Sequence, residues 1–200
     1  KPSRQISGSA ATDRAEDMTL IENGDLWRDI RGGSVAENRP ALFLDRDGTL
    51  IELVSYLLDP ADVVLINSTI SDVRRANANG EAVVVVTNQS GVGRGYYDWA
   101  AFEAVQLRLY QLMSAAGAEI DAVYACPHPP PTAGGPENSR FRKPAPGMLR
   151  RAAADLRLDL SRSRIMGDSA SDLAAGRAAG LSSGILVSNG YGARDRDAAV

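Results

Sequence analysis

Short apolar runs alternate with amphipathic stretches along most of this chain. Residues 82–87 (AVVVVT) are apolar and β-branched without polar alternation, which is typical of a strand buried on both faces. Similar or weaker runs occupy residues 41–45, 120–125, 164–167 and 184–188. Apolar residues at helical spacing predict helices from Ser68 to Asn79, between Asp98 and Gly117, after Pro146, and from Ser169 to Ala179. Strands that alternate with helices predict an α/β fold, in which helices cover both faces of a central parallel sheet.

The chain length of 200 residues is about that of one domain, and the predicted sheet lies within residues 40–190. Residues 1–17 are polar, and we expect a disordered tail there. Residues 18–39 include Leu26 and Trp27, which favour docking of a short element on the core. Residues 191–200 are charged and without pattern, so we expect a C-terminal tail.

Composition and charge argue against several classes of partner. The chain has 22 Lys and Arg against 25 Asp and Glu, a net charge of −3 that disfavours nucleic acid. No apolar run approaches the ~20 residues that span a bilayer, so we expect no membrane association. Cys126 is the only cysteine, which excludes an intramolecular disulfide and favours a reducing compartment, the cytoplasm. Nothing in the sequence demands a partner chain, and we expect a monomer or weak dimer.

Polar side chains gather where the predicted strands end. In parallel sheets, ligands bind at the carboxyl ends of the strands, so these positions are candidates for a site. Asp45 and Asp47 follow the first strand of the predicted sheet directly. The other candidates follow later strands or precede a helix, and they are Thr87, Asn88, Gln89, Ser90, Arg142, Lys143, Asp168 and Asp172.

The four carboxylates of this group restrict what the site can hold. Two unit charges about 4 Å apart repel by roughly 4 kcal/mol at an effective dielectric of 20. Several such pairs would threaten a domain whose whole stability is about 5–15 kcal/mol. Either some carboxyls are protonated or a cation lies among them. Carboxylates without a nearby His or Cys cluster favour Mg²⁺.

The remaining candidates suit an anionic tetrahedral group. Lys143, Thr87 and Asn88 supply hydrogen-bond donors beside the predicted metal. A phosphoryl group needs neutralisation of its peripheral oxygens and an in-line nucleophile. Asp45 can be that nucleophile and form an aspartyl-phosphate, while Asp47 can protonate the leaving oxygen and later activate water. The sequence therefore predicts a Mg²⁺-dependent phosphomonoesterase.

Four segments resemble the motifs of the haloacid dehalogenase (HAD) superfamily of phosphatases. They are DRDGTL (45–50), VVVVTNQSG (83–91), RKPAPGML (142–149) and MGDSASDLAAGRAAG (166–180), in the family's order. The branch that they resemble most is that of the heptose bisphosphate and histidinol-phosphate phosphatases. This resemblance implies a three-layer Rossmann-like fold. Ordinary elements fill the gaps between motifs, so we expect the capless kind.

The resemblance also implies a role for each matching residue. Asp45 would be the nucleophile and Asp47 the general acid and base, with Thr87 and Lys143 holding the phosphoryl group. Asp45, the carbonyl of Asp47 and Asp168 would hold Mg²⁺, and Asp172 would support the site from behind or join the ligands. Substrate contacts are expected from Asn88, Gln89, Ser90, Arg94, Arg142 and Ser169. Residues 91–95 (GVGRG) are interpreted as a mobile loop near the substrate.

The chain departs from this branch at a zinc loop. Heptose-type enzymes have Cys-x-His followed by Cys-x-Cys before the third motif. Here Cys126 and His128 are present, but Ser139 and Phe141 stand at the second pair. Two ligands do not make a closed tetrahedral site, so we expect no structural zinc.

Several functions remain open at this point. The substrate is expected to be a small phosphorylated metabolite, a sugar phosphate or bisphosphate such as D-glycero-D-manno-heptose 1,7-bisphosphate. Histidinol phosphate is an alternative. A receiver-like signalling domain also uses a phosphorylated Asp, but an acid/base such as Asp47 would speed loss of its phosphoryl group. A non-catalytic binding protein on the same fold is disfavoured because Asp45, Asp47, Lys143 and Asp168 are all present.

Overall fold

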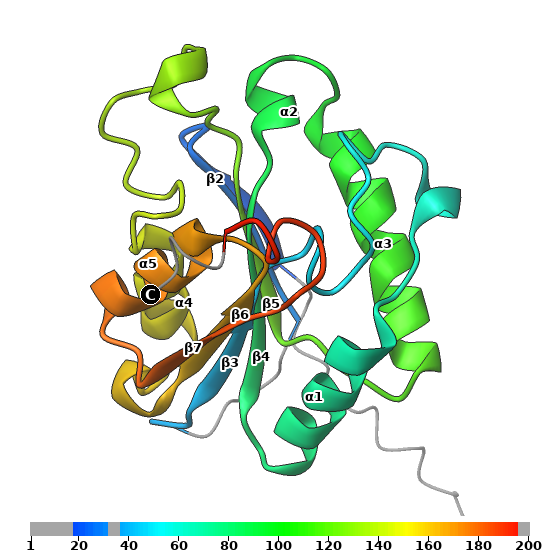
Figure 1. Ribbon diagram of the computed structural model, residues 1–200, viewed down its shortest axis with the longest axis vertical. Helices are drawn as coiled ribbons and strands as arrows, with labels where there is room; N and C mark the ends of the chain where they lie inside the picture. Colours follow the sequence, from blue (N-terminus) through cyan, green and yellow to red (C-terminus); the bar gives the residue numbers. More distant parts are fainter. Residues whose placement is uncertain (1–17, 32–36, 196–200) are drawn as a thin grey trace, which may run out of the picture.

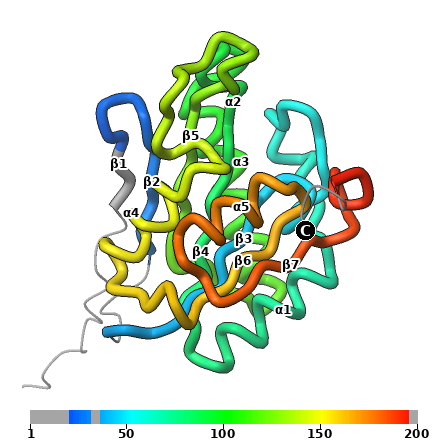
Figure 2. The backbone as a smooth tube through the Cα atoms, turned by 60° about the vertical axis from the view of Figure 1, so that its left-hand side comes forward, coloured from blue at the N-terminus to red at the C-terminus, as the bar shows by residue number. Residues whose placement is uncertain are grey.

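The computed structural model describes residues 18–31 and 37–195 of the chain (Figures 1 and 2). Its seven strands form one sheet in the order β1-β2-β5-β4-β3-β6-β7. The strands are β1 (Met18–Glu22), β2 (Leu26–Ile30), β3 (Ala41–Leu44), β4 (Ala82–Asn88), β5 (Ala122–Cys126), β6 (Arg164–Gly167) and β7 (Ser183–Leu186). The helices are α1 (Asn67–Ala78), α2 (Ser90–Gly93), α3 (Trp99–Ala115), α4 (Gly147–Leu156) and α5 (Ala170–Ala179).

The five strands from β3 to β7 are parallel and lie close to their predicted positions. The sheet as a whole is mixed, however, because β2 pairs antiparallel with both β1 and β5. The prediction of an all-parallel sheet was therefore incomplete. The α/β class with helices on both faces is confirmed.

Helices cover both faces of the sheet and give three layers (Figure 1). Along β4, Val83 and Val85 pack in one core with α1 and α3. The alternate residues Val84 and Val86 pack in a second core with α4 and α5. A strand buried on both faces needs apolar residues at every position, which is why this run shows no polar alternation.

Local sequence signals explain where the helices begin and end. The Asp98 side chain accepts a hydrogen bond from the backbone N–H of Ala101 at 2.9 Å and so caps α3. Gly180, with φ of 86°, ends α5 in the left-handed conformation that glycine adopts most readily. Residues 90–93 form the short helix α2, so the first part of the segment 91–95, interpreted as a loop, is helical.

The N-terminal extension adds a hairpin to the sheet. Strand β2 pairs with the edge of β5, with Trp27 opposite Ala125, and β1 pairs with the outer edge of β2. Figure 2 shows this hairpin beside β5. Trp27 is 1% exposed, and its ring packs edge-on against Phe102 of α3 with centroids 4.9 Å apart. In the segment 18–39, where docking was expected, residues 18–22 and 26–30 form these two strands, and residues 32–36 lie outside the described ranges. The predicted tail at 1–17 lies outside the described residues.

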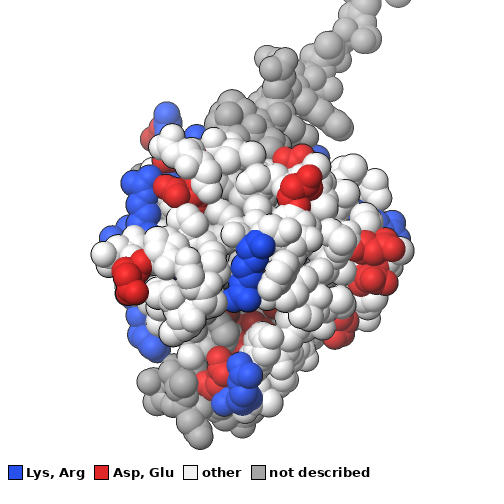
Figure 3. Space-filling model, turned by 90° about the horizontal axis from the view of Figure 1, so that it is seen from above, with Lys and Arg blue, Asp and Glu red and all other residues white. Residues whose placement is uncertain are grey.

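The loops at the carboxyl ends of the parallel strands form one rim of the molecule. The loops that follow β3 and β5 contain only short 3-10 turns, at Pro60–Asp62 and Pro131–Ala133. Within the described ranges, no cap domain is inserted there. Figure 3 views this rim from above, where basic and acidic side chains are scattered among uncharged ones. No helix among the described residues is both long and apolar enough to cross a membrane.

Candidate active site

Asp45 lies directly after β3, the central one of the five parallel strands. Its backbone N–H donates to the carbonyl of Met166, which ties it to the neighbouring strand β6. The Oδ1 atom accepts from the backbone N–H of Arg46 at 2.7 Å. The carbonyl of Arg46 then accepts from Leu50 and Ile51, so the loop folds back tightly after Asp45. This turn places the carboxylate of Asp45 in the cavity at the sheet's rim.

Lys143 lies against the same carboxylate. Its Nζ atom is 2.8 Å from Oδ1 of Asp45, 2.6 Å from Oδ1 of Asp172 and 2.7 Å from the carbonyl of Val86. The Val86 carbonyl accepts a hydrogen bond from this ammonium, which also forms ion pairs with the two carboxylates, and the side chain is 2% exposed. Burial alone would lower the pKa of Lys143. The carboxylates of Asp172 and Asp45 outweigh burial and raise that pKa, so Lys143 stays charged.

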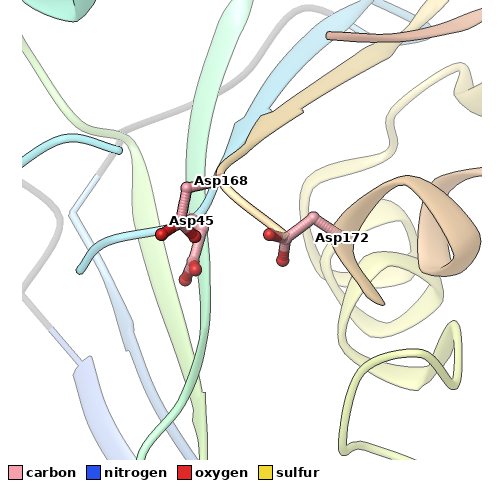
Figure 4. Close-up of side chains that lie close together, drawn as sticks. All are labelled: Asp45, Asp168 and Asp172. Atoms are coloured by element: carbon pink, nitrogen blue, oxygen red, sulfur yellow. The ribbon is translucent and has the colours of Figure 1, made fainter. Parts of the chain in front are cut away.

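Three carboxylates meet beside this ammonium. Asp45, Asp168 and Asp172 each offer an oxygen atom, and these atoms lie within 4.8 Å of one another. Figure 4 shows Asp45 and Asp168 close together at the ends of β3 and β6, with the carboxylate of Asp172 turned toward them from α5. Oxygen ligands of this kind suit a hard divalent cation.

The charges of the cluster do not balance within the protein. Three carboxylates face one ammonium, Lys143, which leaves an excess of negative charge in a buried place. Burial raises the pKa of Asp45 to about 7 and that of Asp168 to about 6. Such shifts mean that ionisation of both groups is costly without a further cation. The residues therefore fit Mg²⁺.

Asp172 is held from two sides and is fully buried. Its Oδ1 atom faces Lys143, and its Oδ2 atom accepts from the backbone N–H of Ser169 at 3.0 Å and from the hydroxyl at 2.8 Å. This capping box begins α5. The arrangement favours the first of the two roles expected for Asp172, support of Lys143 from behind.

Asp47 points into the cavity from the turn after β3. Arg46 donates to both of its carboxylate oxygens from Nε, at 3.2 and 3.1 Å, and to Oδ1 from Nη2 at 3.0 Å. Gln89 donates to its Oδ2 atom from Nε2 at 2.7 Å. Arg46 is 1% exposed, so the carboxylate rests on a buried, fixed guanidinium. Arg46 was not among the predicted site residues, because its place inside DRDGT carries no signal of burial.

Some expected substrate residues instead hold the site together. Asn88 donates from Nδ2 to the carbonyl of Lys143 at 3.2 Å and accepts on Oδ1 from the backbone N–H of Lys143 at 3.0 Å. Both ends of its amide are thus used by one residue. Gln89, 3% exposed, donates from Nε2 to the Asp47 carboxylate and to the Thr87 hydroxyl. These two side chains fix the geometry of neighbouring residues.

A cavity of about 380 Å³ opens over these groups. Arg94, which we expected to contact substrate, is not among its lining residues. The lining includes the predicted residues Asp45, Asp47, Thr87, Asn88, Gln89, Ser90, Arg142, Lys143, Asp168, Ser169 and Asp172. It also includes Leu53, Val54, Ser55, Tyr56 and Leu57 of the loop after β3, and Gly91 of the segment interpreted as lying near the substrate. Three further lining residues were not predicted: Tyr97, Ser171 and Tyr191.

Tyr191 joins the site through its backbone. Its N–H donates to Oδ2 of Asp168 at 2.9 Å. The boundary expected at residue 190 falls inside this turn, so Tyr191 belongs to the site and not to a tail. No side-chain pattern could reveal a contact made by a backbone N–H group.

Arg142 is tied to the loop that follows β5. Its Nη1 atom donates to the carbonyl of His128 at 2.7 Å, and its backbone N–H donates to the Ser139 hydroxyl at 3.2 Å. The same hydroxyl lies 2.7 Å from Nδ1 of His128. On its other side, Nε2 of His128 is 3.0 Å from Oδ1 of Asp25, in the turn between β1 and β2. Partial burial and the nearby Arg94 lower the pKa of Arg142.

Comparisons with known proteins agree with this geometry. A model of the HAD-hydrolase-like family matches residues 140–199. The D-glycero-beta-D-manno-heptose-1,7-bisphosphate 7-phosphatase of Mesorhizobium japonicum is 45% identical over 172 residues, which are 84% of this chain and 78% of that protein. The protein of the same name from Escherichia coli K12 is 36% identical over 160 residues, 78% of this chain and 83% of that protein.

Solved structures give the same result, and they also identify the family. A HAD-like phosphatase from Mesorhizobium loti has a TM-score of 0.77 and 43% identity, covering 84% of this chain and 81% of that chain. A D,D-heptose 1,7-bisphosphate phosphatase from B. bronchiseptica, complexed with magnesium and phosphate, has a TM-score of 0.70 and 30% identity, covering 79% and 86%. Because its relatives are HAD-like phosphatases and its aspartate cluster fits their chemistry, the chain belongs to this family of hydrolases, which act on phosphate monoesters.

Proposed function

We propose that this phosphatase removes the 7-phosphate of D-glycero-D-manno-heptose 1,7-bisphosphate with Mg²⁺ as its cofactor. The observation that carries the chemistry is the contact of Lys143 with Asp45, 2.8 Å apart at the floor of the cavity. The names of the relatives that are 45% and 36% identical support the substrate. Their identity as phosphatases argues against the receiver-like and non-catalytic alternatives.

Asp45 is the proposed nucleophile. Its Oδ1 atom is held by Lys143 and by the backbone N–H of Arg46. The Oδ2 atom is therefore the oxygen that we expect to attack phosphorus. As the aspartyl-phosphate forms, Lys143 and the hydroxyl of Thr87 face the peripheral phosphoryl oxygens and offset their charge.

Asp47 is the proposed acid and base. In the first step it donates a proton to the sugar oxygen that leaves. In the second step it takes a proton from the water that attacks phosphorus, which restores its acid form. Its place two residues beyond the nucleophile, on the same cavity wall, supports both roles.

Asp45 and Asp168 are the proposed side-chain ligands of Mg²⁺, with the backbone carbonyl of Asp47 as a third. When bound, the cation neutralises phosphoryl oxygens and orients the ester for attack. The turn at Tyr191 holds the Asp168 carboxylate through one backbone hydrogen bond, so this ligand is oriented before the metal arrives.

The loop that follows β5 is proposed to keep its shape without a structural zinc ion. The Ser139 hydroxyl lies between His128 and the backbone of Arg142. Phe141 is 5% exposed and packs in the core with α4, and its ring has no atom that could bind zinc. Zinc analysis of the purified protein checks this. The cytoplasmic location and the monomeric or weakly dimeric state stay predictions.

Phosphate release from a panel of esters tests the proposed function. The panel holds both anomers of the heptose bisphosphate, hexose bisphosphates, histidinol phosphate and nucleotides, each with Mg²⁺ and with a chelator. We expect Mg²⁺-dependent release that is fastest from a heptose bisphosphate, with ³¹P NMR showing loss of the 7-phosphate. Faster release from histidinol phosphate or a nucleotide would contradict the proposed heptose bisphosphate substrate.

Matched variants test the nucleophile in the same assay. Asp45→Asn keeps the size of the side chain but cannot form the aspartyl-phosphate, so release should vanish. Asp72→Asn makes the same change on the exposed surface of α1, where Asp72 pairs with Arg75, and should leave release unchanged. Residual turnover by Asp45→Asn would overturn the role of Asp45.

A further inference from the structure

Gln89 is fixed at every polar atom, although it carries no charge. Its backbone N–H donates to the carbonyl of Cys126 at 2.7 Å, and its backbone carbonyl accepts from Val92. Its Nε2 atom donates to Oδ2 of Asp47 at 2.7 Å and to the hydroxyl of Thr87 at 2.8 Å. Its Oε1 atom accepts from the hydroxyl of Tyr97 at 2.6 Å. A buried glutamine in such a place acts as a connector between its neighbours.

The direction of this amide decides what Asp47 meets. The two ends of a glutamine amide have nearly the same shape, and only hydrogen bonds distinguish them. With Nε2 toward Asp47, the amide donates to the carboxylate. Turned over, it would present Oε1 to Oδ2, two acceptors in contact. The Tyr97 hydroxyl, as a donor to Oε1, holds the amide in the first orientation.

The backbone makes room for Tyr97. A Cβ atom at Gly91 would lie 2.2 Å from Cε1 of the Tyr97 ring and 2.9 Å from its hydroxyl oxygen. Any larger residue at this position would push the ring away from Gln89. Burial raises the pKa of Tyr97 to about 12, so the hydroxyl keeps its proton as a donor. Gly91 and Tyr97 thus form one fitted contact on the cavity wall.

We propose that Tyr97 is a positioning residue for the phosphatase reaction and acts through Gln89 to hold the Asp47 carboxylate for proton abstraction from water. This inference rests on the proposed roles of Asp45 and Asp47. Arg46 supports Asp47 from the opposite side, so the carboxylate is held between a buried guanidinium and the Gln89 amide.

The step that this arrangement serves is hydrolysis of the aspartyl-phosphate. A bond forms between the water oxygen and phosphorus, and the bond between phosphorus and the Asp45 oxygen breaks. The electron pair of the broken bond returns to Asp45 as a carboxylate. One proton of the water moves to Asp47, and inorganic phosphate leaves with the other. Within this hydrolysis step, only the proton transfer from water depends on where the Asp47 carboxylate lies.

Rapid-quench kinetics with 4-nitrophenyl phosphate separate this step from the first. Nitrophenolate leaves without a proton, so formation of the phosphoenzyme does not need Asp47 as an acid. In Tyr97→Phe, which keeps the ring against Gly91, we expect hydrolysis of the phosphoenzyme to slow about tenfold, the factor typical of one hydrogen bond. Formation should keep the wild-type rate. Gln89→Met removes all three hydrogen bonds of the amide and should slow hydrolysis further.

Tyr110→Phe is the matched control. It removes a buried tyrosine hydroxyl that donates to Asp29 at 2.7 Å, far from the site, and should leave both rates unchanged. Equal slowing of formation and hydrolysis in Tyr97→Phe, or a wild-type hydrolysis rate in that variant, would overturn the positioning role alone. If the wild-type enzyme forms no phosphoenzyme on Asp45, the proposed chemistry fails, and this inference fails with it.

Discussion

Gly48 shows how a single residue can set the position of a metal ligand. Its φ is 85°, and a Cβ atom there would lie 2.2 Å from Oδ2 of Asp168. A Cβ atom at Gly190, where φ is 53°, would lie 1.9 Å from the same oxygen atom. The Asp168 carboxylate is therefore enclosed by two backbones, each of which needs glycine both for its conformation and for space.

Gly48→Ala should weaken Mg²⁺ binding. The new methyl group displaces Asp168, and we expect the Mg²⁺ concentration for half-maximal activity to rise about tenfold or more, as for changes behind a metal ligand. Gly80→Ala is the control, because Gly80 also has positive φ, 72°, but has open space where a Cβ would lie.

Both glycine variants should lose about 1–2 kcal/mol of unfolding free energy from the left-handed backbone, measured by urea titration. Only Gly48→Ala should change the Mg²⁺ requirement. An equal change in the Gly80 variant would show that strain, and not contact with Asp168, governs the effect.

At the residue scale, the charged residues of the site could be predicted from the sequence, but the partners of its uncharged amide side chains could not. The charged site residues could be predicted because carboxylates that lie close together need a positive charge between them, and the ends of the parallel strands bring such residues together. These residues are Asp45, Asp47, Lys143 and Asp168. The roles of Gln89 and Asn88 could not be predicted. An uncharged amide beside a catalytic group fits either substrate or scaffold, and only the observed hydrogen bonds distinguish the two.

Among the elements, the end of β4 is joined to the segment before α4 by one side chain. Asn88 makes a double hydrogen bond with the backbone of Lys143, 55 residues later in the chain. This contact fixes the backbone from which the Lys143 ammonium reaches Asp45. The position of the ammonium thus depends on two elements and on the amide between them.

Asn88→Ala should lower kcat/KM by about 10- to 100-fold, because small displacements of a catalytic group cost that much. Asn77→Ala is a close control. Asn77 makes the same double hydrogen bond with the backbone of Glu119, outside the cavity. It should cost about 1 kcal/mol of stability and leave kcat/KM unchanged. Comparable activity of the two variants would contradict the role of Asn88.

The parallel strands could be predicted because burial on both faces leaves a run of apolar residues. The hairpin could not, since β2 (LWRDI) mixes apolar and charged residues. The structure shows why those charges are tolerated. Arg28 pairs with Asp155 at 2.6 Å, and Asp29 accepts from the Tyr110 hydroxyl. These partners lie 127 and 81 residues away in the chain, beyond the reach of any local pattern.

For the whole molecule, the aspartate cluster links stability to pH and to metal. Burial raises the pKa of Asp45 to about 7 and that of Asp168 to about 6, from 3.8 for both. Between pH 3.8 and about 7, the folded, metal-free protein holds more protons on these two groups than the unfolded chain does. The contribution of these groups to the free energy of unfolding therefore falls as pH rises from about 4 to about 7, and it stays low above that.

In a chelator, the melting temperature of Asp45→Asn should exceed that of the wild type at about pH 7.5, and the gap should narrow toward pH 4. Asparagine cannot ionise, so it escapes the cost. Saturating Mg²⁺ should close the gap at neutral pH, because the cation stabilises the ionised carboxylates. Asp72→Asn, on the surface of α1, provides the baseline. A constant gap across pH would contradict the raised pKa.

The N-terminal hairpin adds a turn to the rim of the sheet on which the active site lies. Since β2 runs antiparallel to β5, the turn between β1 and β2 lies at the same end of the sheet as the active site. Its Asp25 contacts His128, whose carbonyl in turn holds Arg142. Hairpin turns tolerate changes of length well. Changes in this turn could therefore alter how Arg142 is held at the cavity while the catalytic strands keep their sequence.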